Sequence, residues 1–169
     1  MEGRMSADLY DIDFYTWATT QAALLRSGRL GAVDVGHIAE ELETLGRSEA
    51  AALRSAYRLI CMHLLKMLLQ PDRGQGGSSW ERTINTQRIN AEQILKDNPG
   101  LKPKREALFK EAYAAAKKEA SFETGLALTQ VPEEAPFTLD QVQSEVFWPP
   151  GFPTSRPRAR RRRTKPSAP

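Results

Sequence analysis

The chain has 169 residues, 40% of them hydrophobic and 27% charged, which is typical of a soluble globular protein that is long enough to bury a core. Its single cysteine excludes an intramolecular disulfide and a cysteine-rich zinc site. The formal net charge is +3, but seven of the positive charges lie beyond residue 152, so the residues before them carry +3 − 7 = −4. The basic character of the chain therefore belongs to its C-terminal tail.

Two helices are predicted in the first part of the chain. Asp11 or Asp13 can cap the first helix, and Gly28 follows its last apolar residue as a natural stop. Asp34 can cap the second helix, which Gly46 is expected to end. Both segments space their apolar residues three or four apart, as expected for one buried face of a helix.

A long central helix is predicted over residues 48–70. Ser48 can cap its start, and Pro71 ends it because the residue before a proline avoids helical geometry. The apolar face is wide enough for a helix buried on most sides, with Lys66 expected to extend outward to solvent. Cys61 lies on that face, which favours a packed structural thiol over a nucleophile. The apolar run is too short for a membrane span.

Three further helices are predicted, over residues 78–97, 103–128 and 138–148. The first and third begin at capping-box patterns, Ser78 with Glu81 and Thr138 with Gln141. No segment alternates apolar and polar residues over a useful length, so no sheet is expected. The predicted fold is all-α, a single-domain bundle of about six helices around the central one.

The expected domain organisation has three parts. Residues 1–8 are polar and expected to be disordered, residues 9–152 form the helical bundle domain, and residues 153–169 form a disordered arginine-rich tail. The N-terminus lacks the apolar stretch that is typical of a signal peptide, so a cytoplasmic location is expected.

A series of short segments, in a fixed order along the chain, resembles a bacterial family known as domain of unknown function 29. The segments are YDIDFYTW at 10–17, IAEEL at 38–42, LGRSE at 45–49, HLLK at 63–66, QP at 70–71, SW at 79–80, TI at 83–84, QR at 87–88, DNP at 97–99 and FWP at 147–149. The resemblance spans roughly residues 10–150 and implies an α-helical bundle. It implies no activity, because none is established for the family. The glycine-rich loop after Pro71 and the arginine-rich tail depart from its usual pattern.

One weak catalytic hypothesis concerns His63. If the central helix packs against the helix before it, His63 could face Glu40 or Glu41 and act as a general base oriented by a carboxylate. The simpler interpretation is a histidine at the edge of the core. His37 and Glu41 share a helix face, but the Glu-x-x-His pattern of di-metal bundles is absent, so no metal and no cofactor are expected.

A second hypothesis concerns binding of an anion or a partner. Lys66, Arg82 and Arg88 could supply the positive charge for such a site. The simpler interpretation makes Arg88 half of a surface ion pair, worth under about 1 kcal/mol, and places Trp80 in the core.

Large aromatic residues gather near both ends of the predicted bundle, and some of them, including Trp17 and Trp148, are expected to form an exposed patch. Together with the missing catalytic motifs, this patch leads to a non-enzymatic protein-interaction module as the first hypothesis for function. The partner is expected to be a protein, and a second copy of the chain is one candidate.

The basic tail is the ground for a second functional hypothesis. Its charges would attract phosphate backbones without sequence preference, although it lacks aromatic residues for base stacking. The tail residues assigned to nucleic-acid binding are Arg158, Arg160, Arg161, Arg162, Arg163 and Lys165. The simpler interpretation is a solvated tail that touches nucleic acid only incidentally.

Overall fold

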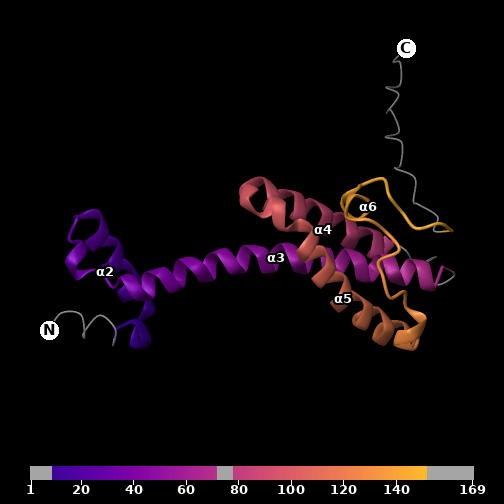
Figure 1. Ribbon diagram of the computed structural model, residues 1–169, viewed down its shortest axis with the longest axis horizontal. Coiled ribbons are helices and arrows are strands. Elements are labelled where there is room, and N and C mark those ends of the chain that lie inside the picture. The colour runs from indigo at the N-terminus through magenta and orange to yellow at the C-terminus, as the bar shows by residue number, and fades with distance from the viewer. Residues whose placement is uncertain (1–8, 72–77, 152–169) are drawn as a thin grey trace, which may run out of the picture. The chain divides into compact units, whose positions relative to one another are not determined.

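A computed structural model describes residues 9–71 and 78–151, and within these ranges it contains helices and no strand, which confirms the predicted all-α class. Residues 9–12 form one helical turn. The longer helices (Figure 1) are α2 (Phe14–Arg26), α3 (Val35–Leu69), α4 (Ser78–Asp97), α5 (Arg105–Thr124) and α6 (Leu139–Gln143). Short 3-10 helices lie at Leu30–Ala32, Pro99–Lys104 and Leu128–Gln130. No helix of the described ranges has the length and apolar content needed to cross a membrane.

The central helix α3 is longer than predicted, because it continues through Gly46 without a break. The predicted division into two helices at this glycine is wrong. Gly46 has no positive φ, and a Cβ built on it would meet no atom within 4 Å. A glycine inside a helix costs only about 0.5–1 kcal/mol relative to alanine, which the hydrogen bonds on either side outweigh. The end of α3 at Leu69 agrees with the stop predicted from Pro71.

The chain divides into two compact units, residues 1–51 (unit 1) and residues 52–169 (unit 2), with the boundary inside α3. The single bundle domain expected over residues 9–152 stays a prediction. The tail assigned to nucleic-acid binding, from Arg158 to Lys165, lies outside the described residues.

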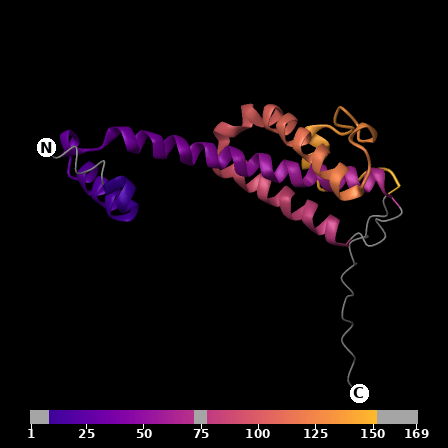
Figure 2. The ribbon, with the colours of Figure 1, turned by 90° about the horizontal axis from the view of Figure 1, so that it is seen from below.

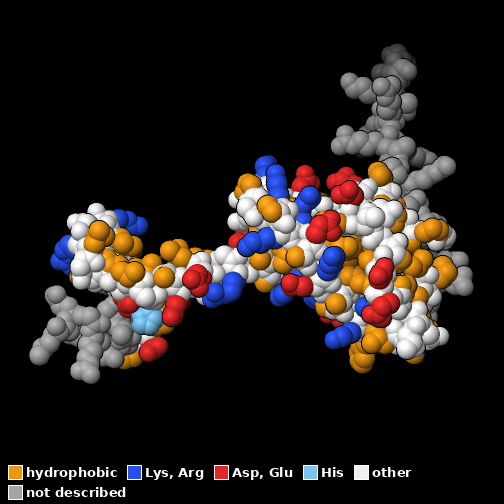
Figure 3. Space-filling view, viewed as in Figure 1, with side chains coloured by type: hydrophobic (Ala, Val, Ile, Leu, Met, Phe, Trp, Pro, Cys, Tyr) orange, Lys and Arg blue, Asp and Glu red, His pale blue; other side chains and the backbone are white. Residues whose placement is uncertain are grey.

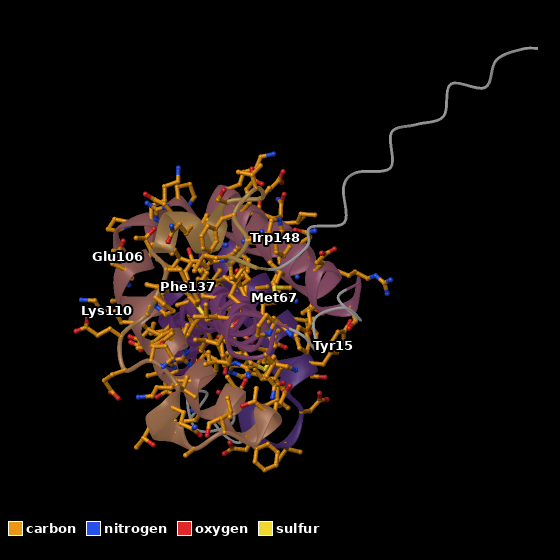
Figure 4. All side chains as sticks on the ribbon, turned by 90° about the vertical axis from the view of Figure 1, so that its right-hand side faces the viewer. Tyr15, Met67, Glu106, Lys110, Phe137 and Trp148 are labelled. Atoms are coloured by element: carbon orange, nitrogen blue, oxygen red, sulfur yellow. The ribbon has the colours of Figure 1, made fainter. Side chains whose placement is uncertain are left out.

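Unit 2 has an extensive core. Helices α4 and α5 lie on either side of the C-terminal part of α3 (Figures 1 and 2), and Met67 of α3 lies between them while Glu106 and Lys110 of α5 lie at the outside (Figure 4). Cys61 is fully buried, as predicted, and burial raises the pKa of its thiol. The largest fully buried side chains of this unit are Tyr57, Leu53, Ile60, Leu64, Leu65, Met67, Ile84 and Val142.

The ends of two helices differ from the prediction. Helix α5 ends at Thr124 and not near residue 128, because Gly125 adopts a φ of 72° and closes the helix with a hydrogen bond from its N–H to the Ser121 carbonyl. Helix α6 begins as predicted, with a capping box between Thr138 and Gln141. It ends at residue 143 instead of near residue 148.

Candidate functional site

A hydrogen-bonded cluster joins the elements of unit 1, and Asp34 lies at its centre. Asp34 caps α3 as predicted, since its Oδ1 accepts from the backbone N–H of His37 at 3.3 Å. Its Oδ2 lies 2.7 Å from His37 Nδ1 and accepts from Trp17 Nε1 at 3.3 Å. The Asp34 backbone N–H donates to Gln21 Oε1 at 2.9 Å. This one residue therefore ties α2 to the start of α3.

Tyr10 places the N-terminal turn on the same cluster. Its ring stacks on the imidazole of His37 with centroids 4.0 Å apart, and its hydroxyl donates to Glu41 Oε1 at 2.5 Å. This hydrogen bond raises the pKa of Tyr10 to about 12, so the hydroxyl stays protonated at neutral pH. Hydrogen bonding to Asp34 raises the pKa of His37. Glu41 thus has a hydrogen-bonding role within unit 1, whereas Glu40 is exposed.

Unit 1 also presents exposed apolar residues, which gather over α2 and the first turns of α3 (Figure 3). Val35, Leu42 and Leu45 are 67%, 64% and 62% exposed, whereas Ile38 is half-buried. Their spacing of three, four and three residues places these four side chains on one face of α3, here called the α3 apolar face. Phe14 and Tyr15 of α2 are also exposed.

His63 lies in unit 2, and the structure does not bring it together with Glu40 or Glu41. The hypothesis needed an interface between two helices, but all three residues belong to α3, with His63 22 residues after Glu41. The His63 ring lies 6.3 Å from that of Trp80, and its Nδ1 is buried with no hydrogen-bond partner in the part of the chain that the structure describes. Burial and the charge of Lys66 lower the pKa of His63. These surroundings suit a neutral structural imidazole.

Lys66 does not extend outward as predicted. It is only 8% exposed, its Nζ pairs with the carboxylate of Glu123 on α5, and the same nitrogen lies 4.6 Å from the ring centroid of Trp80. A charged amine can be buried at this depth because an acid and an aromatic face replace water around it. Lys66 therefore joins α3 to α4 and α5.

Arg88 is 4% exposed and is not half of a surface ion pair, which corrects the simpler interpretation of this residue. Its Nε donates to the Val142 carbonyl and its Nη2 to the Phe147 carbonyl, both at 2.9 Å. Its guanidinium lies 4.9 Å from the ring centroid of Trp148. Arg88 thus holds the segment from α6 to Trp148 against α4.

The other predicted binding residues have different positions. Trp17 is 3% exposed and Trp148 is half-buried, so neither belongs to an open aromatic patch. Arg82 is exposed. Within the described ranges, no three His, Cys, Asp or Glu side chains are grouped to hold a metal ion.

The comparisons with known proteins identify a family for this chain. The model of the family described as domain of unknown function DUF29 matches residues 9–148. The chain belongs to this family. Neither the search of curated proteins nor the search of solved structures gives a match.

The short sequence segments that resemble this family include several residues of the hydrogen-bonded cluster in unit 1. Tyr10 and Trp17 lie in its first segment and Glu41 in its second, but sequence reasoning missed their link through Asp34 and His37. One signal was available. Gln21 interrupts the apolar face of α2 between buried Trp17 and Leu24, and a buried amide requires a hydrogen-bond partner.

Proposed function

We propose that this DUF29 protein is a protein-interaction module that binds a second copy of itself through the α3 apolar face. The observation that supports this is the contrast between buried and exposed residues in unit 1. Within its described part, only Trp17, Gln21 and Leu24 are buried, whereas three residues of the α3 apolar face are more than 60% exposed. A unit of this size gains little stability from so small a core and needs further burial.

The spacing along α3 favours another helix as the occupant of this face. Val35, Ile38, Leu42 and Leu45 follow the alternating three- and four-residue steps of a coiled-coil seam. Ala39 and Gly46 lie next to this seam, and side chains this small allow a second helix to approach closely. A helix of the same sequence offers a matching seam, as a two-fold symmetric interface requires.

The charge pattern favours an antiparallel second copy. Glu40, Glu41 and Glu43 carry three negative charges in the first part of α3, and arginines enter only from Arg47 onward. A parallel pair would align the acidic stretches and repel. An antiparallel pair with its two-fold axis between positions 43 and 44 places Leu42 of one copy against Leu45 of the other. It also places Glu40 of one copy near Arg47 of the other.

Sedimentation equilibrium of the full chain between about 1 and 100 μM tests the proposal, since this range brackets micromolar association. We expect a monomer–dimer equilibrium, and we expect Leu42→Glu to shift it to monomer because the charge enters an apolar seam. Ile89→Glu is the matched control, because Ile89 of α4 is 60% exposed but lies off the α3 apolar face. A monomeric wild type at all concentrations would refute the proposal, as would equal effects of the two variants.

Charge reversal tests the antiparallel arrangement separately. Glu40→Arg and Arg47→Glu should each weaken the dimer, because each creates two like-charged pairs across the two-fold axis. The double variant restores opposite charges and should recover most of the affinity. If the double variant dimerises more weakly than either single variant, the antiparallel alignment is wrong.

The basic tail supports a second candidate function, accessory binding of nucleic acid. Its support is the run of six arginines and one lysine after residue 152. Binding of RNA and DNA by the full chain is compared with that of residues 1–152 over a range of salt concentrations. We expect only the full chain to bind, with affinity that falls steeply as salt rises. Equal binding by both proteins would exclude this role for the tail.

A further inference from the structure

Unit 2 contains a cavity of about 410 Å³ beside Arg88, at the C-terminal part of α4 and the start of α5. Its cationic lining residues are Arg88, Lys96, Lys102 and Arg105, and its acidic ones are Glu92 and Glu145. The charged lining therefore carries a net charge of two positive units. Leu95 is the one large apolar residue among its lining residues, so the cavity suits a polar ligand.

Arg88 contributes a buried positive charge to this cavity. Its Nε and Nη2 donate to backbone carbonyls, and its Nη1 is buried with no hydrogen-bond partner among the described residues. Burial lowers the pKa of Arg88 to about 10, which leaves the guanidinium charged at neutral pH. A buried guanidinium that keeps its charge makes the cavity that it lines favourable for an anion.

Arg105 and Lys102 add positive charge at the same cavity. Arg105 is held in place, because its Nε donates to the Lys102 carbonyl and its Nη1 to Gln143 Oε1, each at 3.2 Å. Its Nη2 makes no hydrogen bond within the described residues and remains available to a ligand. Lys102 is exposed, as expected for a side chain that can close over an anion from the solvent side.

We propose that this cavity binds a small phosphorylated molecule with an otherwise polar body. Guanidinium groups match the geometry of phosphate oxygens, and lysines add charge without fixing direction. A phosphate monoester carries a charge of about −1.5 to −2 at neutral pH, which balances the net positive charge of the lining residues. The volume lies within the range of small-molecule sites and leaves room for a polar body beside the phosphate. The site lies in unit 2 and does not depend on self-association.

Isothermal titration calorimetry of the full chain with glucose 6-phosphate, at low salt, tests this inference. We expect saturable binding of glucose 6-phosphate and none of glucose. Lys102→Gln should weaken binding about tenfold, since it removes one charge-assisted contact. Arg105→Gln should weaken it at least as much. Lys104→Gln is the control, because Lys104 is an exposed lysine of the same segment that does not line the cavity.

Circular dichroism of each variant establishes that the fold is retained. The inference is overturned if glucose 6-phosphate shows no saturable binding up to about 10 mM, the weak end of specific association. It is also overturned if Lys104→Gln weakens binding as much as Lys102→Gln, because the ligand would then respond to surface charge in general.

Discussion

Replacing Gly46 by alanine is expected to stabilise the protein by about 0.5–1 kcal/mol. Gly46 lies inside α3 with no positive φ, and an added Cβ would meet no atom within 4 Å. The methyl group therefore costs nothing in the folded state. In the unfolded state it restricts the backbone, so less conformational entropy is lost on folding.

The matched control is Gly125→Ala. Gly125 also has open space around it, but its φ of 72° lies in the left-handed region, where an alanine costs about 1–2 kcal/mol. Urea unfolding followed by circular dichroism, at a protein concentration low enough to keep the chain monomeric, should therefore show opposite signs for the two variants. Destabilisation by Gly46→Ala would refute the continuous helix and restore the break that the sequence predicts at this position.

Three further predictions concern buried and titratable groups. Arg88→Met should destabilise the protein by about 2–4 kcal/mol in urea unfolding and speed hydrogen exchange over residues 139–148, because two charge-assisted hydrogen bonds are lost. NMR titration should find the pKa of His37 above 6.5 and that of His63 below it. Stability from His37 is thus present below pH 6.5 and lost as pH rises through its raised pKa, whereas stability from His63 is present above pH 6.5 and lost as pH falls. Cys61 should react with a thiol reagent in the native protein only at the rate of unfolding, because it is fully buried with a raised pKa.

Local signals predict many helix ends correctly. Asp34 and Thr138 cap the helices that they were expected to cap, and Pro71 ends α3 to within two residues. These signals act within one turn of the chain, so a few neighbouring residues decide where a helix begins or ends. Gly46 is the exception, because its effect depends on the stability of the helix on both sides, and that stability comes from packing far along the chain.

The polar side chains of the core were predicted least well. Lys66 and Arg88 are charged residues that a sequence pattern assigns to the surface, yet each is at least 90% buried. Their burial depends on partners more than 50 residues away in sequence, Glu123 for Lys66 and the carbonyls beyond Gln141 for Arg88. No local pattern specifies such pairs, so the sequence alone could not place these two side chains in the core.

Hydrogen-exchange protection in the two halves of α3 should depend differently on protein concentration. If a second copy covers the α3 apolar face, residues 35–51 gain protection by mass action as the concentration rises, by up to about 0.7 kcal/mol for each tenfold increase once the dimer is saturated, because the free monomer then rises only as the square root of the total concentration. Residues 52–69 contain Leu53, Tyr57 and Ile60, which are already fully buried within unit 2, and should not change. Hydrogen exchange of the full chain at about 1 and 100 μM measures both halves in one sample. Equal protection of residues 35–51 at the two concentrations would show that no second copy covers this face.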